Sequence, residues 1–121
     1  MGKNRTEILN SVTEIYTKQG IHSVTMDDVS LELGISKKTL YHYFESKNQL
    51  VEQVAYNLLE KNQNKIQQAL SKPGNAIDQL LEVVLEVNQI IKNHNVVFES
   101  DLKKFYPVLY QDLLQKTWFY V

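Results

Sequence analysis

Apolar residues recur every three or four positions along almost the whole chain, and this spacing limits what the chain can fold into. Ile8, Val12 and Ile15 show the spacing first and Gly20 follows as a stop signal, so we predict a helix over residues 5–19. No stretch alternates apolar and polar residues as a half-buried strand does. With 121 residues, the chain is long enough for one compact all-α body.

Two short helices joined by a tight turn are predicted next. Thr25 opens the first of them, with Asp28 three residues later in an approximate capping box. Gly34 ends this helix, and Ser36 is a favourable N-cap for the second. The residues expected to be buried are Met26, Val29 and Leu33 in the first helix and Leu40 and Phe44 in the second. This plan is that of a helix-turn-helix, although two short helices around a glycine turn also occur in many other helical proteins.

A long fourth helix and an apolar fifth helix follow. Ser46 is the expected cap of the fourth, which continues until Pro73 and Gly74 break it. The fifth helix begins after Asn75 and is apolar over a wide arc, so we expect it to be buried on more than one side as part of a core. The arc consists of Ile77, Leu80, Leu81, Val84, Leu85 and Ile91.

The last part of the chain holds two more predicted helices. The sixth covers about 96–105, and Pro107 permits a seventh that starts there and runs to the chain end. We therefore divide the chain into a helix-turn-helix domain over 1–50 and a helical regulatory or core domain over 51–121.

The outer face of the third helix carries the chemistry that points to a function. Once Leu40 and Phe44 face inward, the side chains left outside are Lys37, Lys38, Thr39, Tyr41, His42 and Tyr43, of which Tyr43 has core packing as an alternative. Cations and hydroxyl or imidazole donors bind phosphate oxygens and reach base edges, and a merely solvated face rarely carries so many aromatic residues. This face therefore indicates binding of duplex DNA.

The overall charge gives this reading little support. The formal net charge is −1, and residues 1–50 contain six basic and six acidic residues. The basic signal is local: residues 37–47 contain three lysines, Lys37, Lys38 and Lys47, and a single acidic residue, Glu45.

The stretch from Ile8 to Leu50 resembles the DNA-binding domain of the TetR family of bacterial repressors. The matching positions, in the family's order and spacing, are Ile8, Leu9, Gly20, Thr25, Val29, Leu33-Gly34-Ile35-Ser36, Lys37, Thr39-Leu40-Tyr41, Tyr43-Phe44 and Ser46-Lys47. The resemblance implies a transcription regulator, expected to be a repressor, with a three-helix DNA-binding domain and a helical body for ligand binding and dimerisation.

The resemblance also implies roles for single residues. Thr25 and Lys47 would hold phosphates on either side of the groove, helped by amides at helix starts such as Ser36, although capping alone would also explain Thr25. Lys37, Lys38 and Thr39 would lead the third helix into the major groove, with Lys37 placed for a guanine contact. The remaining contacts would come from Tyr41, His42 and Tyr43.

Two features depart from the family pattern. Asp27 lies where a basic or neutral residue is common, and its carboxylate would repel a phosphate; Asp28 is accounted for by capping. Family members are typically longer, with two last helices that form the dimer, whereas this sequence stops in Trp118-Phe119-Tyr120-Val121. Such an apolar end indicates a truncated chain or an end buried against a partner.

The expected mechanism is a homodimer on a palindromic operator, released when a small molecule occupies the helical body. Candidate residues for this small-molecule pocket are Tyr56, Phe98, Leu102 and Trp118, for which simple core packing is the alternative. His22 and His94 receive no role, because no second ligand stands at metal-binding spacing.

Other classes of function have less support in the sequence. A helical protein-interaction module is the main alternative, favoured by the near-neutral charge, the Asp27-Asp28 pair and the apolar end. We expect no enzyme, metal or cofactor, because no nucleophile with a nearby base, no phosphate loop and no metal spacing is present. The absence of cysteine, of a secretory signal and of a long apolar tract predicts a cytoplasmic protein that does not enter the membrane.

Overall fold

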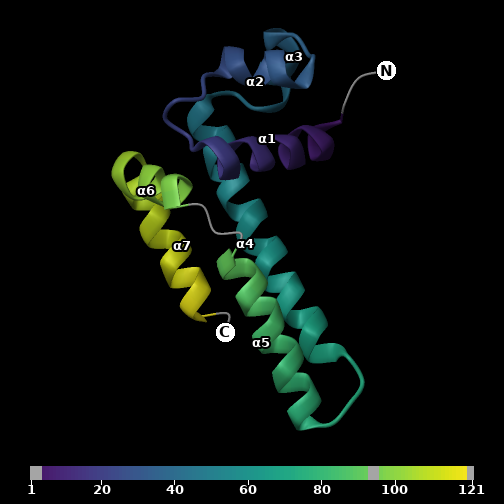
Figure 1. Cartoon of the computed structure of the whole chain (residues 1–121). Helices are drawn as coiled ribbons and strands as arrows, with labels where there is room; N and C mark the ends of the chain where they lie inside the picture. The colour runs from purple at the N-terminus through teal and green to yellow at the C-terminus, as the bar shows by residue number, and fades with distance from the viewer. Residues whose placement is uncertain (1–3, 93–95, 120–121) are drawn as a thin grey trace. The chain divides into compact units, whose positions relative to one another are not determined.

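The computed structural model describes residues 4–92 and 96–119, without the side chains of 117–119. Every regular element in this part of the chain is a helix, which confirms the predicted all-α class (Figure 1). The helices are α1 (Arg5–Gln19), α2 (Met26–Leu33), α3 (Lys37–Tyr43), α4 (Lys47–Ser71), α5 (Ala76–Lys92), α6 (Val96–Phe105) and α7 (Pro107–Phe119). None of the helices searched in the described residues is long and apolar enough to cross a membrane.

Local capping fixes where the first three helices begin. The side chain of Asn4 accepts a hydrogen bond from the amide of Glu7 at the start of α1. Thr25 and Asp28 form both bonds of a capping box at α2, at 3.0 and 2.9 Å, and Ser36 caps α3 by accepting from the amide of Thr39. These contacts satisfy amides that have no partner within a first helical turn, and the predicted caps at Thr25 and Ser36 are confirmed.

Glycine ends the helix before the turn. Gly34 has the left-handed backbone expected at a helix C-cap, and its amide donates to carbonyls of the last turn of α2. The amide of Ile35 then donates to the carbonyl of Ser30 at 3.0 Å. Residues 34–36 thus form a tight turn that joins α2 to α3 (Figure 1).

The chain separates into two compact units, residues 1–57 with 95–121, and residues 58–94. The core of the first unit comes from α1 to α3, the first turns of α4, and α6. Its largest fully buried side chains are Tyr16, Phe44, Ile8, Ile21, Leu40, Leu50, Val12, Val29, Val51 and Val54. The predicted inward faces of α2 and α3 are thus largely as expected, with Leu33 half-buried. The boundary at residue 50 between functional domains stays a prediction.

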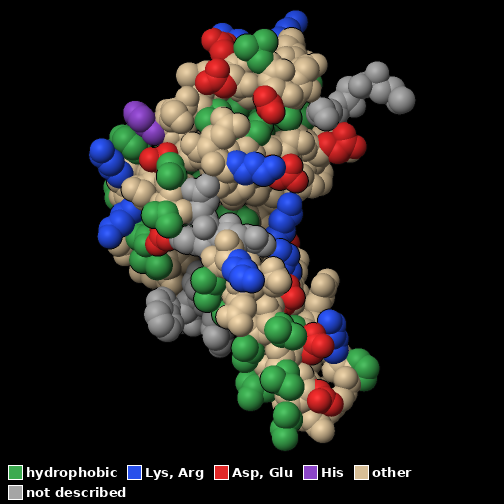
Figure 2. All heavy atoms as spheres, viewed as in Figure 1, with side chains coloured by type: hydrophobic (Ala, Val, Ile, Leu, Met, Phe, Trp, Pro, Cys, Tyr) green, Lys and Arg blue, Asp and Glu red, His purple; other side chains and the backbone are tan. Residues whose placement is uncertain are grey.

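The prediction that α5 is buried on more than one side is wrong. None of its described residues is buried, and the six residues of its apolar arc are 46–69% exposed. Figure 2 shows hydrophobic side chains gathered on the surface of this unit. The reason is geometric: apart from α5, the described part of this unit contains only the second half of α4, and one neighbouring helix cannot cover a wide apolar arc.

The assignment of buried and exposed faces can be tested with two matched substitutions. Leu40→Ala should lower the free energy of unfolding by about 2–5 kcal/mol, because the side chain is fully buried and its removal leaves a cavity. Leu31→Ala should change it by less than about 0.5 kcal/mol, because Leu31 on α2 is 80% exposed. Urea denaturation followed by circular dichroism measures both, and equal losses would contradict the assignment.

Candidate nucleic-acid interface

The exposed side chains of α3 form the outer face predicted from the sequence. Lys37, Lys38, Tyr41 and His42 are exposed, and Thr39 and Tyr43 are half-buried. Leu40 and Phe44 are fully buried below them. The edge of the His42 ring lies against the Tyr43 ring, with centroids 5.1 Å apart. The face therefore presents two ammonium groups, hydroxyls and an imidazole from a helix whose other side is fixed in the core.

Asp27, which the sequence left unexplained, pairs with Lys37. The carboxylate at the start of α2 lies 2.8 Å from the ammonium at the start of α3, and both side chains are more than half exposed. The hydrogen bond to Asp27 raises the pKa of Lys37. The pair partly neutralises the cation that was placed for a base contact, and it holds that ammonium beside the start of α2.

Lys47, at the start of α4, is also engaged within the chain. Its ammonium donates to the carbonyl of Ile21 at 2.9 Å. Partial burial lowers the pKa of Lys47, while the nearby carboxylates of Asp101 and Asp28 act in the opposite direction. An ammonium has three donors, so two are left after this bond. Contact of Lys47 with a phosphate stays a prediction.

The α1–α2 loop is held by a residue that sequence analysis missed. The Asp101 carboxylate on α6 accepts hydrogen bonds from the amides of Ile21 and His22, at 2.8 and 3.0 Å. The His22 ring stacks on Phe105 of the same helix, with centroids 4.1 Å apart. No local pattern reveals a contact between residues 80 positions apart, and the only trace in the sequence is Gly20, where α6 approaches the backbone closely.

Comparison with known proteins agrees with this geometry. Residues 8–54 match the family model of bacterial regulatory proteins of the tetR family. This DNA-binding segment is of the TetR family. The matched segment begins in α1 and ends in the first turns of α4, so it contains the whole candidate interface.

Individual TetR-family relatives match different lengths of the chain. The transcriptional repressor KstR2 of Mycolicibacterium smegmatis is 25% identical over 103 residues, which are 83% of this chain and 50% of the relative. The regulator UidR of Escherichia coli K12 is 42% identical over 50 residues, 41% of this chain and 26% of the relative. The solved structure of the ketosteroid regulator KstR2 of Mycobacterium tuberculosis has the same fold, with a TM-score of 0.69 at 19% identity, covering 97% of this chain and 62% of that one. The chain thus spans about half or less of the curated relatives.

The residues predicted for a small-molecule pocket lie in different surroundings where the structure describes their side chains. Tyr56 lines an open groove of about 510 Å³ together with residues of α6 and α7. Phe98 and Leu102 are buried on α6, where both belong to the core of the first unit. The side chain of Trp118 lies outside the described residues. Tyr56 therefore lines a groove while Phe98 and Leu102 pack in the core, and the ligand role of all four residues stays a prediction.

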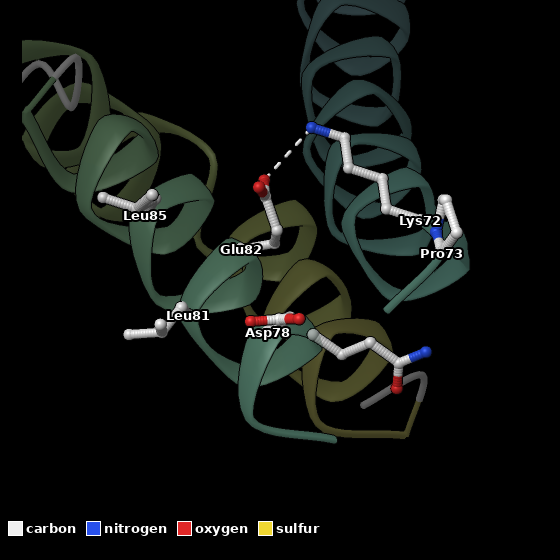
Figure 3. A pocket seen from close by; sticks show the side chains of 7 residues that line it. Lys72, Pro73, Asp78, Leu81, Glu82 and Leu85 are labelled. Carbon is white, nitrogen blue, oxygen red and sulfur yellow. Dashed lines mark hydrogen bonds and ion pairs between the residues drawn. The ribbon is translucent and has the colours of Figure 1, made fainter. Parts of the chain in front are cut away.

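A second groove lies in the unit formed by residues 58–94. It has a volume of about 500 Å³ and is lined by residues on both sides of the α4–α5 turn. Lys72 and Glu82 reach toward each other across it at 3.1 Å, whereas Leu81 points away from Lys72 (Figure 3). Among the residues that the structure describes, no group of three or more His, Cys, Asp or Glu side chains could hold a metal ion.

The close approach of α6 to Gly20 can be tested against Gly34, which also has a positive φ. Gly34→Ala should cost about 1–2 kcal/mol of unfolding free energy, because only the backbone is strained and nothing lies near the added carbon. Gly20→Ala should cost at least about 1.5 kcal/mol more, since its backbone (φ 83°, ψ −175°) is one that only glycine readily adopts and its Cβ would lie 2.6 Å from Val97 and 2.9 Å from the Asp101 carboxylate that binds the loop. Thermal and urea denaturation measure the difference, and equal costs would show that α6 does not press on the loop.

Proposed function

We propose that this chain binds duplex DNA through α2 and α3 and acts as a transcription regulator, most simply a repressor. The observation that carries the proposal is the outer face of α3, which presents Lys37, Lys38 and hydroxyl donors while Leu40 and Phe44 fix the helix below. The face lies within a segment matched by a family of bacterial regulatory proteins. A regulator of bacterial genes works where the DNA is, so we also propose a cytoplasmic location.

In this proposal α3 enters the major groove and α2 crosses the backbone. Lys37 is placed to donate to guanine, and Lys38, Thr39, Tyr41, His42 and Tyr43 share base-edge and phosphate contacts. Thr25, Ser36 and Lys47 stand at the starts of α2, α3 and α4, where helix amides also attract phosphates. Phosphate contacts at these three helix N-termini would position the domain on the duplex, whereas side chains of α3 would read the base sequence.

The modest charge of the interface predicts a shallow dependence on salt. Its cations are Lys37, Lys38 and Lys47, and two of them already have partners in the chain. Because Lys37 is paired with Asp27 and directed at a base, phosphate contacts by Lys38 and Lys47 give a slope of about −2 in log affinity against log salt for each domain. Contacts with particular bases, rather than non-specific electrostatic attraction to phosphates, would then supply much of the selectivity.

Regulation requires two copies and a ligand, and both belong to this proposal. Two copies place two α3 helices in successive major grooves of a palindromic operator. A small-molecule effector that prefers a conformation with wrongly spaced α3 helices then releases the DNA. The link from α6 to the α1–α2 loop through Asp101 supports this route, because it ties the body of the chain to the segment just before α2.

A protein-interaction module is the second candidate. It is favoured by the exposed apolar arc of α5, where Ile77, Leu80 and Ile91 are each more than 60% exposed. Exposed apolar patches of this kind often mark contact with another protein. This function would leave the outer face of α3 without a ligand, so measurement of DNA binding separates the two candidates.

Selection from random duplex DNA at low salt tests the proposal directly. A retained palindrome with half-sites about one helical turn apart would support specific binding by two copies. A single enriched half-site would support sequence-specific DNA binding by one copy, without dimerisation. No enrichment, together with no affinity for mixed duplex DNA, would refute DNA binding and favour the interaction module.

The Asp27–Lys37 pair yields a separate prediction about selectivity. Asp27→Asn should raise affinity for all duplex sequences and make the salt slope steeper by up to about one, because a repelling carboxylate is removed and Lys37 is released. Glu60→Gln is the matched control, since it removes the same charge at an exposed position of α4 outside the interface. Fluorescence anisotropy at several salt concentrations measures both. An unchanged slope for Asp27→Asn would show that the pair does not limit DNA binding.

A further inference from the structure

An open groove in the first unit carries a second set of chemical groups. It has a volume of about 510 Å³ and lies between the first turns of α4 and the α6–α7 junction. Its lining residues are Asn48, Glu52, Tyr56, Phe105, Tyr106, Pro107, Val108, Leu109 and Asp112. The described lining therefore combines two carboxylates and three aromatic rings with apolar side chains, and it includes no basic residue. This volume is that of a small-molecule site.

One end of the groove already holds an ammonium group from the chain itself. The Lys116 ammonium lies 3.2 Å from a carboxylate oxygen of Asp112 and 4.3 Å from the centre of the Tyr56 ring. The Tyr56 hydroxyl donates to the same carboxylate, and these two hydrogen bonds keep the pKa of Asp112 below its usual value. An aromatic face beside an ionised carboxylate is a typical environment for a cation, and here it is occupied by one.

The second carboxylate, Glu52, has no such partner. It lies one helical turn before Tyr56 on α4 and is exposed. No hydrogen bond or ion pair to its side chain is present among the described residues. Glu52 thus remains an unpaired negative charge one turn from Tyr56, where it attracts positive charge and repels anions, whereas the Lys104 ammonium lies 5.2 Å from the centre of the Phe105 ring.

The apolar side of the groove is connected to the α1–α2 loop. Phe105 lines the groove, and its ring stacks on His22 of that loop. Asp101, one turn earlier on α6, accepts the amides of Ile21 and His22. A molecule that rests on Phe105 therefore contacts the same helix that holds the segment before α2.

We propose that this groove binds an organic cation with an apolar body, placing the ammonium between Glu52 and the Tyr56 ring and the body along Phe105, Pro107 and Leu109. Charge complementarity favours this class, because a neutral molecule gains nothing from Glu52 and an anion is repelled. The inference rests on the proposed function only in assigning this cation as the effector. Binding itself can be measured without DNA.

Three probes of one shape and different charge test the proposal on the full chain: 4-phenylbutylammonium, 4-phenylbutanol and 4-phenylbutyrate. Calorimetry and amide chemical shifts in a ¹⁵N-labelled sample measure their binding. The cation should bind about three- to fivefold more tightly than the alcohol or better, the butyrate most weakly, and the shifts should fall on residues 48–56 and 105–112. Equal binding of cation and alcohol, or shifts confined to α5, would overturn the proposal.

Two substitutions separate the roles of the charged groups. Glu52→Gln should reduce the preference for the cation over the alcohol about three- to fivefold, and Glu60→Gln, an exposed acid on α4 outside the groove, should leave it unchanged. Lys116→Gln should strengthen cation binding, because it removes the chain's own ammonium from Asp112 and Tyr56. All three positions are exposed or half-buried, and thermal melting checks that the variants fold. An unchanged preference in Glu52→Gln would refute the assignment.

The same protein preparation distinguishes failure of this site from failure of the proposed function. DNA binding without charge-selective cation binding would refute the groove assignment alone. Cation binding in a chain that binds no DNA would keep the site and refute the regulator. If both occur, saturating cation should lower the affinity for the selected DNA, and Glu52→Gln should weaken this effect; an unaltered DNA affinity would show that the cation is not the effector.

Discussion

A carboxylate on α6 anchors the α1–α2 loop. Asp101 accepts two neighbouring amides, from Ile21 and His22, and Lys47 donates to the carbonyl of Ile21 from another helix. Hydrogen bonds to charged groups are stronger than neutral ones, and here three of them converge on two residues and give partners to both of their amides. The start of α2 follows directly after this loop. The placement of α2 is therefore tied to α6 as well as to its own helix-turn-helix.

The candidate interface has few cations, and most of them are paired with groups of the chain itself. The chain is close to neutral, Lys37 is paired with Asp27, and Lys47 is used to hold the loop. Paired cations contribute less to indiscriminate attraction of phosphate, although they can still donate to an acceptor that offers better geometry. In the proposed function, such a surface would rely on shape and on hydrogen bonds at base edges to tell one duplex from another.

Contacts between residues three or four apart could be predicted from the sequence, and distant ones could not. The capping box of Thr25 and Asp28 follows from residue types at fixed spacing, as do the C-cap at Gly34 and the N-cap at Ser36. The pair of Asp27 with Lys37 requires the angle between two helices, and the bonds from Asp101 cross 80 positions. For α5, periodicity correctly indicated an apolar arc but carried no information on what would cover it, which is why burial was predicted wrongly.

The shortness of α3 has a thermodynamic consequence. A helix of seven residues, Lys37–Tyr43, is far below the length at which isolated helices persist in water. Its order comes from burial of Leu40 and Phe44 and from the cap at Ser36, so it is established when the first unit folds. The conformational entropy of arranging these side chains is thus lost during folding rather than at the moment of contact with a ligand. Helix α3 is therefore ordered before any ligand binds, and its order will disappear together with the core beneath it.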